Sequence, residues 1–367
     1  AQGTLADVSH NKNSKIGPFL TGHTPPRVWE KVPAEELFAQ GKIRLSTGPI
    51  HTVKPLEIEI PKGRLTVVSG VSGSGKTTLV LESLVPALDA QVRHAPLPAH
   101  VRAVQAPGIE QVKLIDATPI GINVRSTVAT YANVHDELRK LFARTPDAKQ
   151  RGYKAGDFSY NTGRLRCAGC DGTGEISLDV QFLPDVDVPC PTCRGARYAR
   201  EAFDVKYTNQ RGEKFSLPEL MALDVSAALD ACADWKVVRQ RLQILQDLGL
   251  GYLTLGEETP SLSGGEAQRL KLASEMGKPQ HSTVFVFDEP TIGLHPLDVR
   301  TLLGVFQRLI QNGATVVVIE HDLDVLRHAD YIIDMGPGGG SAGGTVVACG
   351  PAETIKQCPQ SLTGRDL

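Results

Sequence analysis

The sequence feature that most constrains the fold is a glycine-rich octapeptide between an expected strand and an expected helix. Residues 70–77 read GVSGSGKT and fit the pattern GxxxxGK[ST]. The residues before them, 65–68, form an apolar strand, and residues 76–88 have helical spacing. Strand, loop and helix in this order bind phosphate through backbone N–H groups and a helix N-terminus. A plain Gly/Ser-rich turn, the alternative, does not account for the flanking elements.

The octapeptide therefore predicts a site for a nucleoside triphosphate. We expect Lys76 to reach the β- and γ-phosphates and the Thr77 hydroxyl to bind Mg²⁺. The residues assigned to the phosphate site are Gly70, Ser72, Gly73, Gly75, Lys76, Thr77 and Thr78.

A second apolar strand ends in two carboxylates. The segment TVFVFDEP starts at Thr283 and delivers Asp288 and Glu289 to the carboxyl end of a buried strand, where parallel sheets bind ligands. Two carboxylates are costly there unless a cation is bound nearby. We expect Asp288 to hold Mg²⁺ and Glu289 to polarise an attacking water. Strands and helices alternate around this segment, which predicts an α/β fold with a parallel sheet.

A second anion site is expected at LSGGE, which starts at Leu262 and opens a helix. Its predicted contacts are Ser263, Gly264, Gly265 and Glu266. One nucleotide does not need two such sites in one chain, so this loop is expected to close over ATP held by another module. His321 follows the apolar run VVVIE and is a candidate contact to the γ-phosphate, although a lone histidine is more often structural.

Four of the seven cysteines form two CxxC pairs between these motifs. Cys167 and Cys170 precede Cys190 and Cys193 by nineteen intervening residues, a spacing typical of a four-cysteine zinc site. An iron–sulfur cluster and a redox dithiol pair remain alternatives. The other three cysteines are scattered, which favours a reducing cytoplasm over a disulfide framework.

The formal net charge of −2 does not favour a protein coated with basic residues, so any polyanion site must be a local patch. Cations flank the cysteine pairs, with Tyr160 and Tyr198 interleaved, and suit a nucleic-acid backbone. A solvated surface is the competing interpretation. The candidate DNA contacts are Arg164, Arg166, Arg194, Arg197 and Arg200.

The first twenty residues resemble the last twenty. With an offset of 347 positions, five identities fall in register without a gap: Ala1, Gly3, Ser14, Gly17 and Leu20 with Ala348, Gly350, Ser361, Gly364 and Leu367. Coincidence between two tails is one explanation. The other is an internal repeat, in which the chain begins with the tail of an earlier, similar module.

Taken together, the motifs resemble those of the ABC-type ATPases, and LSGGE is their signature. The segments LSGGEAQRLKLASE, DEPTIGLHPLD and EHDLDV, with RCAGCDGTGEISLDVQFLPDVDVPCPTCRGARY, are similar to the C-terminal half of the UvrA family. The resemblance implies an ABC ATPase core with a parallel sheet, interrupted by an α-rich signature domain that carries a zinc module. The expected domains are a preceding module's tail at 1–24, core at 25–117, signature domain at 118–255 with zinc module at 167–193, and core at 256–367.

The same resemblance implies an ATP-dependent DNA-binding subunit for damage recognition in nucleotide excision repair, with ATP, Mg²⁺ and Zn²⁺ as cofactors. It implies damaged double-stranded DNA, a second ABC module in the same full-length chain, a homodimer, and a UvrB-like partner bound through an N-terminal half outside this sequence. A cytoplasmic location without a membrane partner is expected, because no apolar run is long enough to span a bilayer.

Two departures from the family point to a divergent branch. The position after Asp116 usually holds Gln but here is Ala117, so Asp116 or a water would have to replace the amide contact. Asp322 stands where Asn is usual after the histidine. The alternatives for function are a UvrA-like drug-resistance protein that acts on DNA-bound drugs and the ATPase subunit of an ABC transporter.

Overall fold

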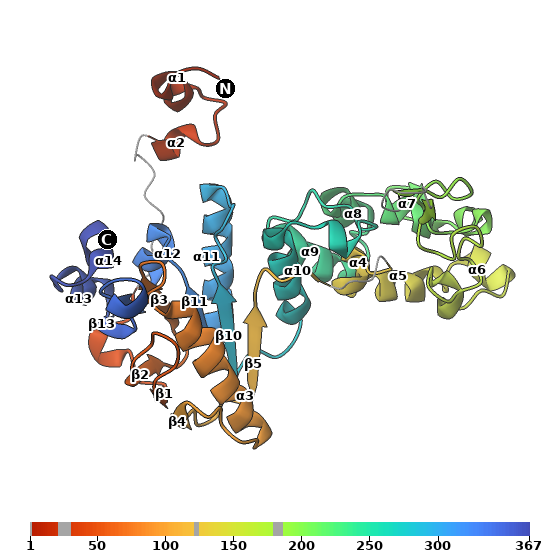
Figure 1. Ribbon diagram of the computed structural model, residues 1–367. Coiled ribbons are helices and arrows are strands. Elements are labelled where there is room, and N and C mark those ends of the chain that lie inside the picture. Colours follow the sequence, from red (N-terminus) through yellow and green to blue (C-terminus); the bar gives the residue numbers. More distant parts are fainter. Residues whose placement is uncertain (1, 21–30, 121–124, 179–185) are drawn as a thin grey trace. The chain divides into compact units, whose positions relative to one another are not determined.

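The computed structural model describes residues 2–20, 31–120, 125–178 and 186–367. The chain forms two compact units. The first, called the core unit, joins Ala1–Ala117 to Lys278–Leu367, and the second, the inserted unit, is Thr118–Gly277 (Figure 1). A chain that leaves the core and returns to it matches the expected α/β fold with an inserted domain.

A six-stranded sheet is the centre of the core unit, in the order β13-β12-β3-β11-β10-β5. All neighbouring strands are parallel except β12 and β13. Strands β3, β10 and β11 consist mainly of apolar residues, because side chains on both faces of a parallel sheet are buried under helices. The strand bounds are β3 Leu65–Gly70, β5 Gln111–Ile115, β10 Thr283–Asp288, β11 Thr315–Ile319, β12 Tyr331–Gly336 and β13 Thr345–Gly350.

Helices cover the sheet on opposite faces because side chains alternate along each strand. Val284 and Val286 of β10 belong to the core cluster that includes Leu84 and Leu88 of the phosphate-loop helix. Phe287 of the same strand points the other way and packs on Phe306, with ring centroids 4.7 Å apart. The flanking helices of the core unit are α3 Val85–Arg93, α11 Pro296–Gln311, α12 Leu323–His328, α13 Ala352–Lys356 and α14 Leu362–Asp366.

The helix after the phosphate loop begins with a π-helical segment, Thr78–Leu84, and continues as α3. Pro86 explains this irregularity, because it has no N–H to bond the carbonyl four residues earlier. The amide of Val85 bonds the carbonyl of Val80 instead. The expected helix at 76–88 is therefore present, extends to Arg93, and changes its hydrogen bonding at the proline.

A three-stranded antiparallel sheet packs beneath this helix in the order β2-β1-β4. Its strands are β1 Lys42–Thr47, β2 Leu56–Pro61 and β4 Val101–Gln105. Strand β2 leads through a turn directly into β3, as the sequence LEIEIPKGRLTVVSG predicts. This sheet supports the helix that carries the phosphate loop.

The inserted unit is built from short helices and two hairpins. Its helices are α4 Val128–Tyr131, α5 Val134–Phe142, α6 Pro146–Gln150, α7 Leu217–Met221, α8 Val225–Ala231, α9 Lys236–Asp247 and α10 Gly264–Met276. The hairpin strands are β6 Glu175–Leu178 with β7 Val186–Pro189, and β8 Tyr207–Thr208 with β9 Lys214–Phe215.

The structure divides the chain after Gly277, whereas the sequence placed the return to the core at 256. The reason is that α10, the helix opened by LSGGE, packs against α9 and α4 of the inserted unit. Its buried residues include Leu270 and Leu272. Among the described residues, none of the helices has the length and apolar character that crossing a membrane requires.

The two chain ends have the same local structure. Helix α1, Leu5–His10, and the short helix α2, Gly17–Leu20, form the N-terminal tail. The Ser14 hydroxyl accepts the amide of Gly17, as the Ser361 hydroxyl accepts that of Gly364.

The agreement extends to two further features at the same offset. The amide of Asn11 bonds the carbonyl of Val8, and the amide of Cys358 bonds that of Ile355. A Cβ at Gly17 would lie 2.8 Å from the Val8 carbonyl oxygen, and one at Gly364 would lie 2.3 Å from that of Ile355. The similarity of the two chain ends thus extends from five identities to matching hydrogen bonds.

Candidate nucleotide and metal sites

The register of the core sheet brings the predicted nucleotide-binding residues to one edge. Asp288 lies opposite Ile319, and Ile319 lies opposite Val68. Asp288, the residue after Ile319 and the phosphate loop after Val68 therefore emerge together at the carboxyl ends of three adjacent parallel strands. Parallel sheets of this kind bind their ligands at that edge.

The phosphate loop is held by backbone contacts that only glycine permits. Gly70 has φ +134°, and a Cβ there would lie 2.0 Å from the Met335 carbonyl oxygen. Lys76 is buried and donates from Nζ to the carbonyl oxygens of Gly70 and Val71, at 2.8 and 3.0 Å. Burial lowers the pKa of Lys76, while Glu289 acts against that shift. The ammonium group of Lys76 thus lies against the backbone at the start of the phosphate loop.

The other predicted members of the loop differ in exposure. Ser72, Gly73 and Thr77 are exposed, so their polar groups are accessible to a ligand. The Thr78 hydroxyl donates to the Glu82 carboxylate, 3.0 Å away and one turn along the helix, so it already has a partner. Thr77 therefore remains the better placed of the two threonines for a cation.

Asp288 and Glu289 lie at the end of β10, as predicted. Asp288 is half-buried, and burial raises its pKa, with Glu289, Asp116 and Glu320 adding to the effect. Asp116 approaches because β5 and β10 are in register, with Ile115 opposite Phe287. A cluster of carboxylates that raises the pKa of one member is a chemically suitable site for a divalent cation. Asp116, beside the substituted position Ala117, belongs to this cluster.

Glu320 is a site residue that the sequence reasoning missed. Its carboxylate is fully buried and accepts the amides of Thr291, His321 and Asp322, at 3.0, 2.7 and 3.0 Å, and the Thr291 hydroxyl. It therefore fixes the loop after Glu289 and the start of the loop that carries His321. The available signal was an acidic residue directly after the apolar strand β11, which is the argument that identified Asp288.

His321 projects from the end of β11 with its side chain 65% exposed. It lines a pocket of about 210 Å³ with the start of the phosphate loop, Ser69 to Val71, and with α12 and α14. The structure thus places His321 beside the start of the phosphate loop.

Asp334 is a second buried carboxylate that the sequence reasoning did not single out. It accepts the hydroxyls of Ser361 and Thr363, at 2.6 and 2.7 Å. The Thr363 hydroxyl also lies 3.2 Å from that of Ser69, directly before the phosphate loop. The repeated motif at the C-terminus is therefore tied to the strand that positions the loop.

The signature segment lies in the inserted unit. Ser263 caps α10, and its hydroxyl and amide both donate to the Glu266 carboxylate. The exposed Tyr252 donates its hydroxyl to the other oxygen of Glu266. Gly264 and Gly265 form the first turn of α10, directly after this cap.

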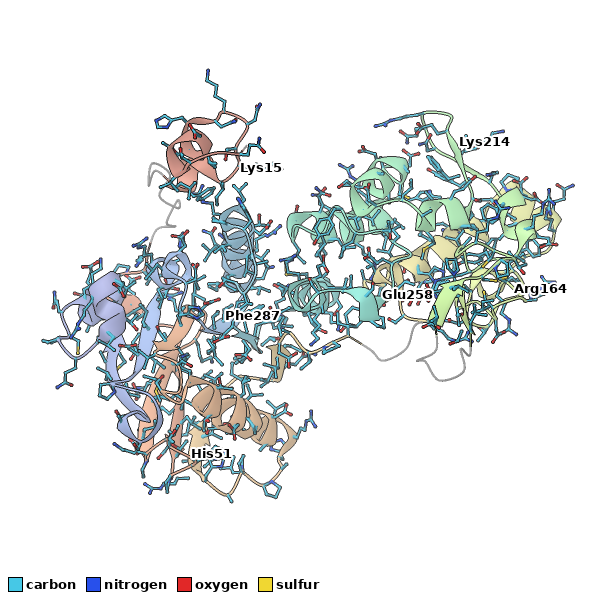
Figure 2. All side chains as sticks on the ribbon, turned by 45° about the horizontal axis from the view of Figure 1, so that its top comes forward. Lys15, His51, Arg164, Lys214, Glu258 and Phe287 are labelled. Carbon is cyan, nitrogen blue, oxygen red and sulfur yellow. The ribbon has the colours of Figure 1, made fainter. Side chains whose placement is uncertain are left out.

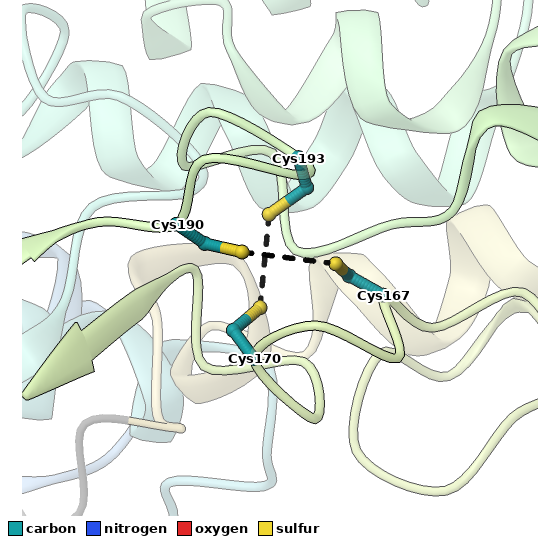
Figure 3. A group of neighbouring side chains, drawn as sticks. All are labelled: Cys167, Cys170, Cys190 and Cys193. Atoms are coloured by element: carbon teal, nitrogen blue, oxygen red, sulfur yellow. Dashed lines mark hydrogen bonds between the residues drawn. The ribbon is translucent and has the colours of Figure 1, made fainter.

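The four predicted cysteines converge in the inserted unit (Figure 3). Their Sγ atoms all lie within 4.8 Å of one another, with Cys167 and Cys190 at 3.9 Å and Cys170 and Cys193 at 3.6 Å. A tetrahedron of Zn–S bonds of about 2.3 Å places sulfurs about 3.8 Å apart, so the cluster has the size that zinc requires. Backbone N–H groups of Cys193 and Thr192 lower the pKa of the Cys190 thiol to about 6, whereas burial raises the pKa of the Cys193 thiol to about 12.

The predicted DNA contacts divide into two groups. Arg164, Arg194 and Arg200 are exposed, and Arg166 is half-exposed. Figure 2 shows Arg164 on the inserted unit, where it pairs with Asp157. Arg166 likewise pairs with Asp171 at 3.0 Å, so the surface position of these side chains is shown, and two of them are already engaged with carboxylates.

The prediction that Arg197 contacts DNA is wrong. It is only 4% exposed and pairs with Glu258, so it cannot serve as a surface contact to DNA. Tyr160 and Tyr198 are fully buried and cannot stack on bases. These three residues form the interior of the module because their polar tips find partners there, such as Tyr198 with the carbonyl of Phe158.

Known proteins are similar to this chain in sequence and in fold. UvrABC system protein A of Aquifex aeolicus (strain VF5) is 43% identical over 371 residues, covering 100% of this chain and 39% of that protein. The protein of the same name from Bacillus subtilis (strain 168) is 43% identical over 369 residues, covering 100% of this chain and 38% of that protein. The chain thus spans about two fifths of the length of the curated relatives it matches.

A solved structure agrees over nearly the whole chain. The crystal structure of UvrA2 from Deinococcus radiodurans superposes with a TM-score of 0.87 at 38% identity, covering 98% of this chain and 43% of that one. Protein-family models give no match to the chain.

Proposed function

This chain belongs to the UvrA family of ABC-type ATPases, and we propose that it supplies an ATP-dependent, DNA-binding half of a damage-recognition subunit for nucleotide excision repair. The observation that carries the proposal is that one compact unit holds both the ABC signature segment and a four-cysteine cluster. The core unit beside it in sequence carries a complete phosphate loop and two carboxylates at one sheet edge. The relatives over the full length of the chain bear the name UvrABC system protein A.

ATP hydrolysis is assigned to the core unit. Lys76 neutralises the β- and γ-phosphates, Thr77 and Asp288 hold Mg²⁺, and Glu289 orients and polarises the attacking water. Magnesium supplies charge neutralisation on the phosphates. His321 contacts the γ-phosphate from the pocket beside the loop. Glu320 keeps the two loops that carry Glu289 and His321 in a fixed relation.

The signature segment acts on a different nucleotide. We assign Ser263, Gly264, Gly265 and Glu266 to ATP held by another ABC module, either in the same full-length chain or in a homodimer partner. The repeat of the tail at both chain ends supports a tandem arrangement, because its hydrogen bonds recur at the same offset. A UvrB-like partner would then bind outside this region.

Zinc is assigned to Cys167, Cys170, Cys190 and Cys193, where it would hold the two knuckles together without an open coordination position. The exposed cations Arg164, Arg166, Arg194 and Arg200 would then face a DNA backbone. Arg197 would not, because it is buried.

The test uses the natural full-length protein with its other phosphate loop disabled. Glu289→Gln is expected to lower ATP hydrolysis by about 10² to 10⁴-fold, because it removes the group that polarises the water, while ATP binding persists. Lys76→Ala is expected to abolish hydrolysis at this site by removing the cation on the phosphates. Unchanged turnover in both variants would refute the nucleotide assignment.

The DNA assignment is tested on duplexes with and without a lesion. We expect tighter binding to damaged duplex in the parent protein and a change in that preference with ATP. Equal binding to intact and damaged duplex, with preference for a duplex carrying an intercalated drug, would favour the drug-resistance role instead.

A further inference from the structure

The buried arginine of the cysteine module lies between the metal cluster and the segment that leads into the signature. Arg197 follows Cys193 by four residues, and Glu258 precedes Ser263 by five. Their side chains meet with Nη2 and Oε1 2.5 Å apart, at side-chain exposures of 5% and 22%. Figure 2 shows Glu258 inside the inserted unit.

Arg197 is part of the frame that holds the cluster together. Its carbonyl accepts the amide of Cys167 at 2.9 Å, which joins the exit of the second knuckle to the entry of the first. Its guanidinium donates to the carbonyl of Gly172 and lies 5.3 Å from the centre of the Tyr160 ring. The side chain is therefore fixed to both knuckles, and a shift of either knuckle moves it.

Glu258 is fixed in turn to the signature. Its carbonyl accepts the amide and the hydroxyl of Ser261, at 3.2 and 2.7 Å, in the turn that ends at the helix cap Ser263. Next to it, the buried Thr259 donates its amide to the carbonyl of Ser126 at 3.0 Å. Glu258 itself forms an antiparallel bridge with Thr127, so backbone bonds hold this segment and the ion pair adds its side-chain link to Arg197.

We propose that Arg197 and Glu258 are positioning residues that couple the cysteine module to the ABC signature. The coupling is direct. Arg197 is bonded to both knuckles and pairs with Glu258, and the carbonyl of Glu258 is bonded to the turn that leads to Ser263. A buried ion pair transmits displacement well, since separating its members leaves an uncompensated charge in the protein interior. The functional consequence, that DNA contact at the module alters the ATP site, rests on the proposed function above.

Hydrogen–deuterium exchange of the natural full-length protein tests the coupling without ATP or DNA. In the parent, removing zinc with a chelator should speed exchange about tenfold or more both in residues 165–198 and in residues 259–266. In Glu258→Gln, zinc removal should still speed exchange in 165–198 but add less than about twofold in 259–266, because the variant has lost the charge of the ion pair.

Two further variants guard against a simple loss of folding. Arg197→Lys keeps the charge and should retain part of the response in 259–266. Asp204→Asn breaks the exposed pair with Arg151 in the same unit and should behave as the parent. If zinc removal speeds exchange in 259–266 equally in the parent and in Glu258→Gln, or does not change it in the parent, the proposal is overturned.

ATPase measurements separate this inference from the proposed function. Glu258→Gln should abolish most of the change in kcat that DNA causes, while KM for ATP stays within about twofold, since the phosphate loop is untouched. A parent protein without ATPase activity or without a DNA response refutes the proposed function. The exchange experiment still decides the ion pair in that case.

Discussion

The core unit and the inserted unit are stabilised in different ways. The core unit buries continuous apolar strands, such as β10 and β11, on both faces of one sheet, and its polar groups emerge at the strand ends. The inserted unit has no long strand among its described residues, and its interior contains a cysteine cluster, an ion pair and hydrogen-bonded tyrosines. The difference predicts that single polar substitutions unfold the inserted unit more readily than the core.

Loss of a metal ligand should separate the two units most clearly. Cys170→Ser is expected to release zinc and remove at least about 5 kcal/mol of stability from the inserted unit, because structural zinc supplies about 10–16 kcal/mol in zinc-finger peptides. Trp235, which packs 4.0 Å from Tyr207 between ring centroids, reports on this unit in a Trp29→Phe background. Its fluorescence in urea, with zinc measured by atomic absorption, checks the loss.

The core should be unaffected by the same change. Binding of a fluorescent ATP analogue is expected to persist in Cys170→Ser. Cys349→Ser, at an exposed cysteine of the core unit, is the matched control and should keep both zinc and stability. Full zinc content in Cys170→Ser would contradict the metal assignment.

In the core unit, the buried carboxylate of Glu320 is also expected to be sensitive to substitution. Glu320→Gln is expected to destabilise the core unit by about 3 kcal/mol, because an amide cannot accept all of the amides and hydroxyl that the buried carboxylate accepts. Hydrolysis should fall with it, since Thr291 and His321 lose their common partner. Urea unfolding of the core unit measures the first effect.

An exposed glutamate of the same unit provides the control. Glu353→Gln breaks a surface pair with Lys356 and should cost less than about 0.5 kcal/mol. Equal stability of the two variants would show that the buried network does not hold the two loops.

Sequence predicted the core better than the inserted unit for a physical reason. The phosphate loop and Asp288 are contiguous with the strands that place them, so an apolar run followed by glycines or acids predicts the strand, the edge and the role. The four cysteines were also predictable, because each CxxC pair is a local turn. Glu320 was overlooked, although the same local rule applies to it.

The rest depends on contacts between segments that are far apart in the chain. Arg197 and Glu258 are 61 positions apart, and nothing near either residue indicates that they meet. A surface cation and a buried one have the same local sequence, so Arg197 was grouped with Arg194. Helix α10 likewise belongs to the inserted unit because it packs against α9, and the sequence of α10 does not reveal that contact.

Acid should weaken the inserted unit through a buried histidine. Burial lowers the pKa of His135 to about 3, and its Nε2 lies 2.7 Å from the hydroxyl of Tyr198. The unfolded chain takes up a proton near pH 6.5 while the folded protein does not, so stability is lost as pH falls below that value. The loss between pH 7 and pH 5 should be about 2 kcal/mol.

Because acid also protonates metal-binding thiolates, the measurement compares His135→Gln with the parent by Trp235 fluorescence in urea at several pH values. The variant should show a shallower fall of stability with pH. Parallel pH profiles for the two proteins would exclude His135 as the titrating group.

The smallest effect is expected at the surface of the inserted unit, where the comparison between buried and exposed arginines can be made directly. Arg194→Ala removes an exposed cation of the second knuckle and should weaken duplex binding less than about tenfold, with the slope of log K against log salt reduced by about one. Zinc content and stability should not change, because the Arg194 side chain is exposed. Arg93→Ala, at an exposed arginine of the core helix α3, should leave the slope unchanged. Fluorescence anisotropy with labelled duplex at several salt concentrations measures both, and equal slopes for the parent and Arg194→Ala would show that the exposed arginine, like the buried Arg197, does not contact DNA.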